Sequence, residues 1–307
     1  MSAFSLRRLL VDVFEPEPGE RVTVMTDLPH GSLADHPDWA ERRLMAAEWQ
    51  QAFAALGQER GFEVHPLLTY PATGAHNADL PSEGFLGQER VSLEEILSRT
   101  TLAVALTEFS PTAPLALRAA RQPDFRAATL PGVLRRMEQT ALAADYRRIA
   151  ARCQWIRERL EPAEEMEVLF ATGHLWRVDL RYRRVEVDDG HLPRHKPPPL
   201  RVINLPSGET YQVPYEGERP GEPSRSQGQI PVFAGGEVVV LAVEENRIVE
   251  VQGQGSAAEA YRALFEADPA RRNIAEVAFG CNEKAVVTGN ILEDEKAGFH
   301  WAFGRSD

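Results

Sequence analysis

Strand-like and helix-like segments alternate along the first 135 residues of the chain. Arg21–Thr26 and Thr101–Leu106 are short apolar runs of the length typical for buried parallel strands. Phe62–Tyr70 predicts a further strand, and apolar residues at helical spacing begin at Pro37. Strands separated by helices predict a parallel sheet with helices on its faces. We therefore expect this part of the chain to form a Rossmann-like α/β domain.

The second part of the chain, residues 136–307, has a different pattern. Leu134–Leu160 predicts one or two arginine-rich helices, which Pro162 ends. Ser256 and Glu259 have the spacing of a capping box and predict a helix that runs to about Phe265. The strand candidates are Met166–Phe170, Leu175–Tyr182, Arg201–Asn204, Glu237–Val243, Arg247–Gln252, Ile274–Phe279, Ala285–Val287 and Phe299–Phe303. These segments predict a β-rich α+β domain, so that the fold class of the whole chain is α/β.

Charge and composition narrow the classes of function. The net charge is -12 at pH 7, which argues against a general nucleic-acid binder and against binding to anionic membranes. No run approaches the length of a transmembrane helix, and the N-terminus lacks the pattern of a signal peptide. Cys153 and Cys281 lie far apart in the sequence and match no disulfide or zinc spacing. We expect a cytoplasmic protein, and no nucleotide-binding motif is present.

Three segments of the second part place chemically useful side chains in unusual settings. Asn204–Glu209, with the sequence N-L-P-S-G-E, puts a carboxylate on a Pro/Gly turn after a strand. Glu276 interrupts an apolar strand, where its charge is costly unless a cation or hydrogen bonds compensate it. His300 lies in the apolar segment F-H-W-A-F-G. Taken singly, each has an ordinary explanation: a solvated loop, a half-exposed strand and a core histidine.

An acidic run, Glu293–Glu295, precedes the histidine segment. Such a run is most often a solvated helix face. Its carboxylates could instead orient metal ligands from behind.

Together the three segments resemble the thermophilic metalloaminopeptidase family of aminopeptidase T. In that family a glutamate follows an N-x-P turn, a second glutamate lies in an A-E-V-A strand, and a histidine opens an H-I-A-F-G segment. These positions match Glu209, Glu276 and His300, in the same order. The run T-G-N-I-L-E-D-E-K, which begins at Thr288, is similar to shorter relatives labelled leucyl aminopeptidase-like. The resemblance is specific from about residue 200 onward.

The resemblance implies a metal-dependent aminopeptidase that uses metal-activated water to release N-terminal amino acids from peptides. Glu209, Glu276 and His300 would be metal ligands, and Glu276 could also take the proton of the water. Zinc, cobalt, manganese and magnesium all suit such ligands. The family completes its site with an H-x-D pair that has no counterpart up to Asp307, so we expect the natural chain to continue. A homodimer is also implied.

Two other functions stay open. Dihydroxypyridine dioxygenases resemble the same family and hold one Fe(II) with two histidines and an aspartate. His300 would then be the first histidine, and the two glutamates would contact the substrate or orient ligands. The third possibility is a binding protein with an incomplete metal site that performs no catalysis.

Overall fold

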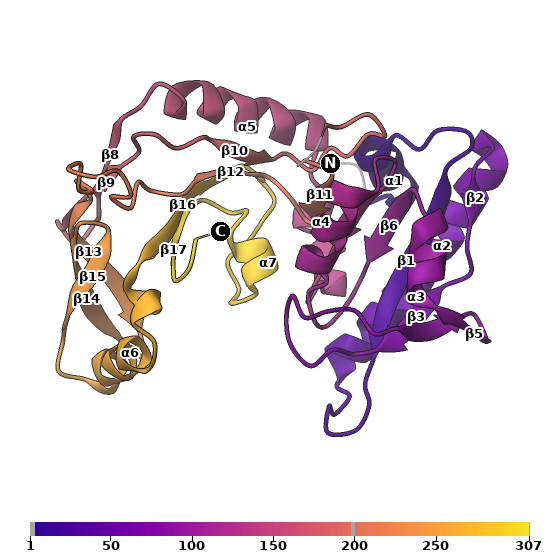
Figure 1. Cartoon of the computed structure of the whole chain (residues 1–307), viewed down its shortest axis with the longest axis horizontal. Helices are drawn as coiled ribbons and strands as arrows, with labels where there is room; N and C mark the ends of the chain where they lie inside the picture. The colour runs from indigo at the N-terminus through magenta and orange to yellow at the C-terminus, as the bar shows by residue number, and fades with distance from the viewer. Residues whose placement is uncertain (1–3, 198–199, 307) are drawn as a thin grey trace. The chain divides into compact units, whose positions relative to one another are not determined.

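The computed structural model describes residues 4–197 and 200–306 (Figure 1). They form two compact units, and neither is one continuous stretch of chain. Unit 1 consists of Met1–Cys153, Asp188–Glu209 and Cys281–Gly298, and unit 2 of Gln154–Val187, Thr210–Gly280 and Phe299–Asp307. The boundary expected near residue 135 stays a prediction, while two later segments join the N-terminal part in unit 1.

An eight-stranded sheet forms the centre of unit 1, in the order β11-β7-β6-β1-β3-β4-β5, with β2 paired to β1. The pairs β11–β7, β7–β6, β6–β1, β1–β2 and β1–β3 are parallel, whereas β3–β4 and β4–β5 are antiparallel. The strands are β1 (Arg21–Leu28), β2 (Glu63–Val64), β3 (Leu68–Pro71), β4 (Glu83–Leu86), β5 (Glu89–Ser92), β6 (Leu102–Ala105), β7 (Arg126–Thr129) and β11 (Val202–Asn204). The predicted α/β fold with a parallel sheet is confirmed.

Local sequence explains the helices of this unit. Helix α2 begins after His36, whose side chain accepts a hydrogen bond from the backbone N–H of Trp39, and it ends at Gly61 with a φ of 78°. Its apolar face buries Trp49 and Phe53. The helices of this part are α1 (Leu6–Phe14), α2 (Pro37–Arg60), α3 (Leu93–Arg99), α4 (Thr112–Arg121), α7 (Ile291–Asp294), the 3-10 turns η1 (Arg135–Glu138) and η2 (Ala141–Ala143), and the start of α5 (Tyr146–Leu160).

Unit 2 is built mainly from antiparallel strands. One sheet has the order β15-β14-β13-β9-β8, and a smaller sheet has the order β10-β12-β16-β17. The strands are β8 (Glu165–Leu169), β9 (Leu175–Asp179), β10 (Glu186–Asp188), β12 (Glu209–Gln212), β13 (Gln227–Ala234), β14 (Glu237–Glu244), β15 (Arg247–Gln252), β16 (Ile274–Gly280) and β17 (Phe299–Phe303), accompanied by α6 (Ser256–Ala267) and η3 (Pro269–Arg272). The core includes Trp176, Leu241 and Phe265. The β-rich character expected for the C-terminal part is confirmed.

A buried ion pair between Asp179 and Arg181 lies at the C-terminal end of β9. Asp179 accepts hydrogen bonds from Arg181 Nε at 2.9 Å and Nη2 at 2.7 Å, and from the backbone N–H of Arg225 at 2.9 Å. Burial alone would raise the pKa of Asp179, but these hydrogen bonds bring it below the usual value.

Two local predictions in the second part are wrong. Helix α6 has Gly255 as its N-cap and no side-chain capping bond, because Glu237 from β14 accepts the N–H of Ala257 instead. The segment Ala285–Val287 forms no strand and is irregular. The carboxylate of Glu237, from a distant strand, thus replaces the predicted capping box.

No helix in the described part of the chain is long and apolar enough to cross a membrane.

Candidate functional site

Glu276 and His300 are brought together on neighbouring antiparallel strands of unit 2. In the register of β16 and β17, Glu276 lies opposite Ala302 and His300 opposite Ala278, so the two side chains are diagonal neighbours on one face. Glu276 Oε1 lies 3.4 Å from His300 Nε2. Both side chains are partly shielded, at 30% and 18% exposure, so their interaction is less screened than that of a surface pair.

The opposite face of the same strands explains why this pair is held firmly. Val277 and Trp301 are directly opposite each other; Val277 belongs to the core of unit 2, and the partly buried Trp301 packs against it. The ring of Trp301 packs edge-on against Trp176, with 5.9 Å between centroids. A register slip of β17 by one residue would turn Trp301 outward, so the apolar face fixes where the carboxylate and the imidazole point.

A carboxylate oxygen and an imidazole nitrogen are suitable ligands for zinc and other divalent transition metals. Glu276 and His300 therefore fit two positions of a metal-binding set. Within residues 4–197 and 200–306, no group of three or more His, Cys, Asp and Glu side chains is arranged to hold a metal ion. The pair is a partial donor set.

Glu209, the third predicted ligand, belongs to unit 1. It is the first residue of β12 and is 8% exposed. Its Oε1 accepts a hydrogen bond from Lys296 Nζ at 2.6 Å, and the ammonium also lies 3.2 Å from Glu295 Oε2. Lys296 is 1% exposed. Burial alone would lower the pKa of Lys296, but the surrounding carboxylates hold it above its usual value.

Asp188 completes this charged cluster and was not predicted from the sequence. Burial raises its pKa to about 6, against the opposing attraction of Lys296. Its Oδ2 accepts the backbone N–H of Asn204 at 3.2 Å. Its Oδ1 is shielded from solvent and has no hydrogen-bond partner within the described ranges. The local sequence V-D-D-G carries no signal that separates Asp188 from a surface aspartate.

The turn before Glu209 is fixed by its own sequence and by distant residues. The Leu205–Pro206 peptide bond is cis, and Gly208 has a φ of 120°. A Cβ atom at Gly208 would lie 2.8 Å from Ile149 Cγ2. The amide of Asn282 donates to the carbonyl oxygens of Ser207 and Ala141, each at 3.0 Å. The P-S-G-E segment therefore needs glycine at this position for both conformation and space.

The acidic run has two kinds of carboxylate. Glu293 is fully buried, accepts a hydrogen bond from Thr140 Oγ1 at 2.5 Å and is paired with Arg136, so its interpretation as a solvated residue is wrong. Asp294 accepts the N–H groups of Thr288 at 2.7 Å and Gly289 at 2.9 Å. In the structure both residues hold the segment that precedes Lys296 in place.

Comparison with known proteins shows the architecture alone. No protein-family model and no curated protein sequence matches the chain. A solved structure of the 2,5-dihydroxypyridine dioxygenase from Pseudomonas putida KT2440 is similar, with a TM-score of 0.62 and 16% identity over 97% of this chain and 83% of that one. AmpT, the aminopeptidase T of Thermus thermophilus, is similar with a TM-score of 0.52 and 16% identity over 98% of this chain and 85% of that one. The chain thus shares a remote structural relationship with a dioxygenase and an aminopeptidase.

Proposed function

We propose that this protein is a metal-dependent hydrolase that releases N-terminal amino acids from peptides. The observation that carries the proposal is the contact between Glu276 Oε1 and His300 Nε2, a mixed oxygen and nitrogen donor pair on a rigid sheet face. Zinc, cobalt, manganese or magnesium would be the cofactor. The likeness to an aminopeptidase structure supports this choice of scaffold. Glu209 as a further ligand stays a prediction of the sequence resemblance.

Glu276 and His300 would hold the cation from adjacent strands. A bound divalent metal lowers the pKa of a coordinated water and polarises a carbonyl group. Glu276 could also accept a proton from water, because its carboxylate would lie beside the bound cation. The Glu276 side chain is 30% exposed, whereas the Nε2 atom of His300 is shielded from solvent, so Glu276 is the accessible member of the pair.

Metal binding is tested most directly with Co(II), whose visible absorption reports nitrogen and oxygen ligands. We expect saturable Co(II) binding to the wild-type protein and a large loss of Co(II) affinity in Glu276→Gln and His300→Ala. The loss should exceed the roughly 10- to 100-fold decrease in metal affinity that is typical when only a residue behind a ligand is removed. His174→Ala is the matched control, since this histidine is half-buried, bonds to Thr172 and lies in the same unit. Equal Co(II) affinity in all four proteins would refute the ligand assignment.

Activity is tested with amino-acid p-nitroanilides in the presence of each divalent metal. Release of p-nitroaniline that Glu276→Gln abolishes would support the peptidase. Absence of turnover with every metal, despite metal binding, would reject it.

A dioxygenase is the second candidate, favoured by the higher structural similarity to the dihydroxypyridine enzyme. Here His300 would bind Fe(II), and Glu276 would orient it or contact the substrate. Oxygen uptake with Fe(II) and 2,5-dihydroxypyridine distinguishes this reaction from hydrolysis. If neither reaction occurs and metal binds without turnover, the binding-protein interpretation holds.

A further inference from the structure

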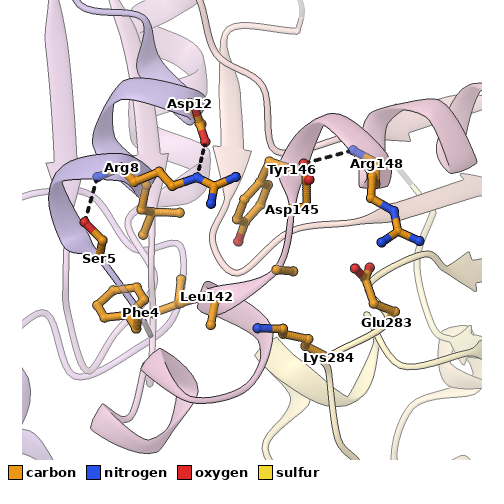
Figure 2. A pocket seen from close by; sticks show the side chains of 13 residues that line it. Phe4, Ser5, Arg8, Asp12, Leu142, Asp145, Tyr146, Arg148, Glu283 and Lys284 are labelled. Atoms are coloured by element: carbon orange, nitrogen blue, oxygen red, sulfur yellow. Dashed lines mark hydrogen bonds and ion pairs between the residues drawn. The ribbon is translucent and has the colours of Figure 1, made fainter. Parts of the chain in front are cut away.

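A cavity of about 210 Å³ opens in unit 1, at the start of α1 and α5. This volume has room for about seven water molecules, which suits a small ligand. Figure 2 shows Arg8 from α1, Arg148 from α5 and Lys284 from the segment after β16 around the same hollow. Phe4 and Leu142 supply an apolar part of its wall. The cavity therefore combines cationic groups with a hydrophobic surface.

The three cationic side chains carry N–H groups that donate to no acceptor within the described residues. Arg8 donates from Nε to Asp12 Oδ2 at 3.2 Å, and its two terminal nitrogens make no hydrogen bond to any described residue. Arg148 and Lys284 hydrogen-bond through their backbone N–H groups, and their side chains donate to no residue within 4–197 and 200–306. The other two lysines of the chain, Lys196 and Lys296, are both in ion pairs.

The acidic side chains of the cavity wall already have partners. Asp12 pairs with Arg8, and Glu283 pairs with Arg152 at 2.5 Å. Asp145 Oδ1 accepts the backbone N–H groups at the start of α5, at 3.1 and 3.3 Å. Ser5 likewise caps α1. The caps and the acidic side chains are thus engaged with neighbours inside the protein, and the terminal N–H groups of Arg8, Arg148 and Lys284 stay open to a ligand.

We propose that this cavity binds a small organic oxyanion, a carboxylate or a phosphate, through Arg8, Arg148 and Lys284. An arginine presents paired N–H groups that match either oxyanion, and a lysine adds a flexible point charge. Phe4 and Leu142 would contact an apolar part of the ligand. The site is built within unit 1 and does not depend on Glu276 or His300.

Lysine chemistry provides a direct probe of this site. Reductive methylation with ¹³C-formaldehyde keeps the positive charge and gives each dimethyl-lysine a separate NMR signal. With three lysines in the chain, the signal of residue 284 is identified by its absence in Lys284→Gln. The labelled protein is titrated with inorganic phosphate and, separately, with benzoate at constant ionic strength.

We expect a saturable shift of the Lys284 signal with at least one probe, and the stronger probe identifies the kind of oxyanion. Arg8→Gln or Arg148→Gln should weaken binding about two- to fivefold, the effect of losing one exposed charge pair. Arg147→Gln is the control, because Arg147 is the exposed neighbour on α5 and does not line this cavity. No saturable shift up to about 20 mM of either probe would overturn the proposal, since the binding free energy would then be weaker than about -2.3 kcal/mol. Equal weakening by Arg147→Gln would also overturn it.

Discussion

Replacing Asp188 by asparagine should make the protein more stable at neutral pH, although it removes a charge next to Lys296. Burial holds the pKa of this carboxyl at about 6, above the ordinary value of 3.8. The folded protein therefore keeps a proton on Asp188 at a pH where the unfolded chain has lost it. Because the folded state binds more protons between about pH 4 and pH 6, stability from this group falls as the pH rises through that window.

The size of the effect follows from the two pKa values. A difference of about two pH units corresponds to about 3 kcal/mol of unfolding free energy, fully lost above pH 6. Asparagine resembles the protonated acid and cannot ionise. Its amide places an N–H donor near the position of Oδ1, which has no described hydrogen-bond partner, and an unsatisfied donor costs about 1–3 kcal/mol. We expect a net gain of about 0–2 kcal/mol at pH 8.

Urea unfolding at intervals from pH 4 to pH 8 measures this difference. Wild type should be the more stable protein near pH 4, and it should lose this advantage over Asp188→Asn as the pH rises to about pH 7. The matched control is Asp189→Asn, which removes the neighbouring carboxylate that pairs with Lys196 at 3.0 Å. If Asp188→Asn keeps the full wild-type fall in stability between pH 4 and pH 6, the assignment of this fall to Asp188 is refuted.

Three further changes test other parts of the structure. Lys296→Met should lower the unfolding free energy, measured in denaturant, by about 3–5 kcal/mol, because it leaves the buried Glu209 without its ammonium partner. Adding Glu209→Gln should restore part of this stability, and no recovery would contradict the pairing of Lys296 with Glu209. Gly208→Ala should cost more than about 1 kcal/mol in thermal unfolding, since its φ is 120° and a Cβ would lie 2.8 Å from Ile149; an unchanged Tm would contradict the close approach. Asp179→Asn should reduce the unfolding free energy above pH 4 and have a smaller effect at lower pH, because the folded state lowers the pKa of Asp179 and this contribution is lost when the acid is protonated. A stability difference between wild type and variant that stays constant as the pH falls would contradict this.

Local patterns in the sequence were sufficient for the elements whose contacts are local. The apolar run that became β1, the helix α2 and the hairpin of β14 and β15 all lie where hydrophobic spacing and turn residues place them. The hairpin turn contains Glu245 and Asn246, both with positive φ, as a tight turn between paired strands requires. The strand β11 was predicted at the correct residues, but its partner β7 lies about 75 residues earlier, and a pattern within a strand does not specify so distant a partner.

Among the candidate site residues, the resemblance to aminopeptidase T predicted Glu209, Glu276 and His300, and the apolar patterns around Glu276 and His300 already indicated strands. Only the tertiary structure decided that Glu276 faces His300, because their contact depends on the register of two strands joined by a long connection. It also decided that Glu209 is buried against Lys296, and that the positive charge of Lys296 also acts on Asp188. The sequence by itself determines which groups can ionise. Their burial and their neighbours, which determine what ionisation costs, arise only when distant segments fold together.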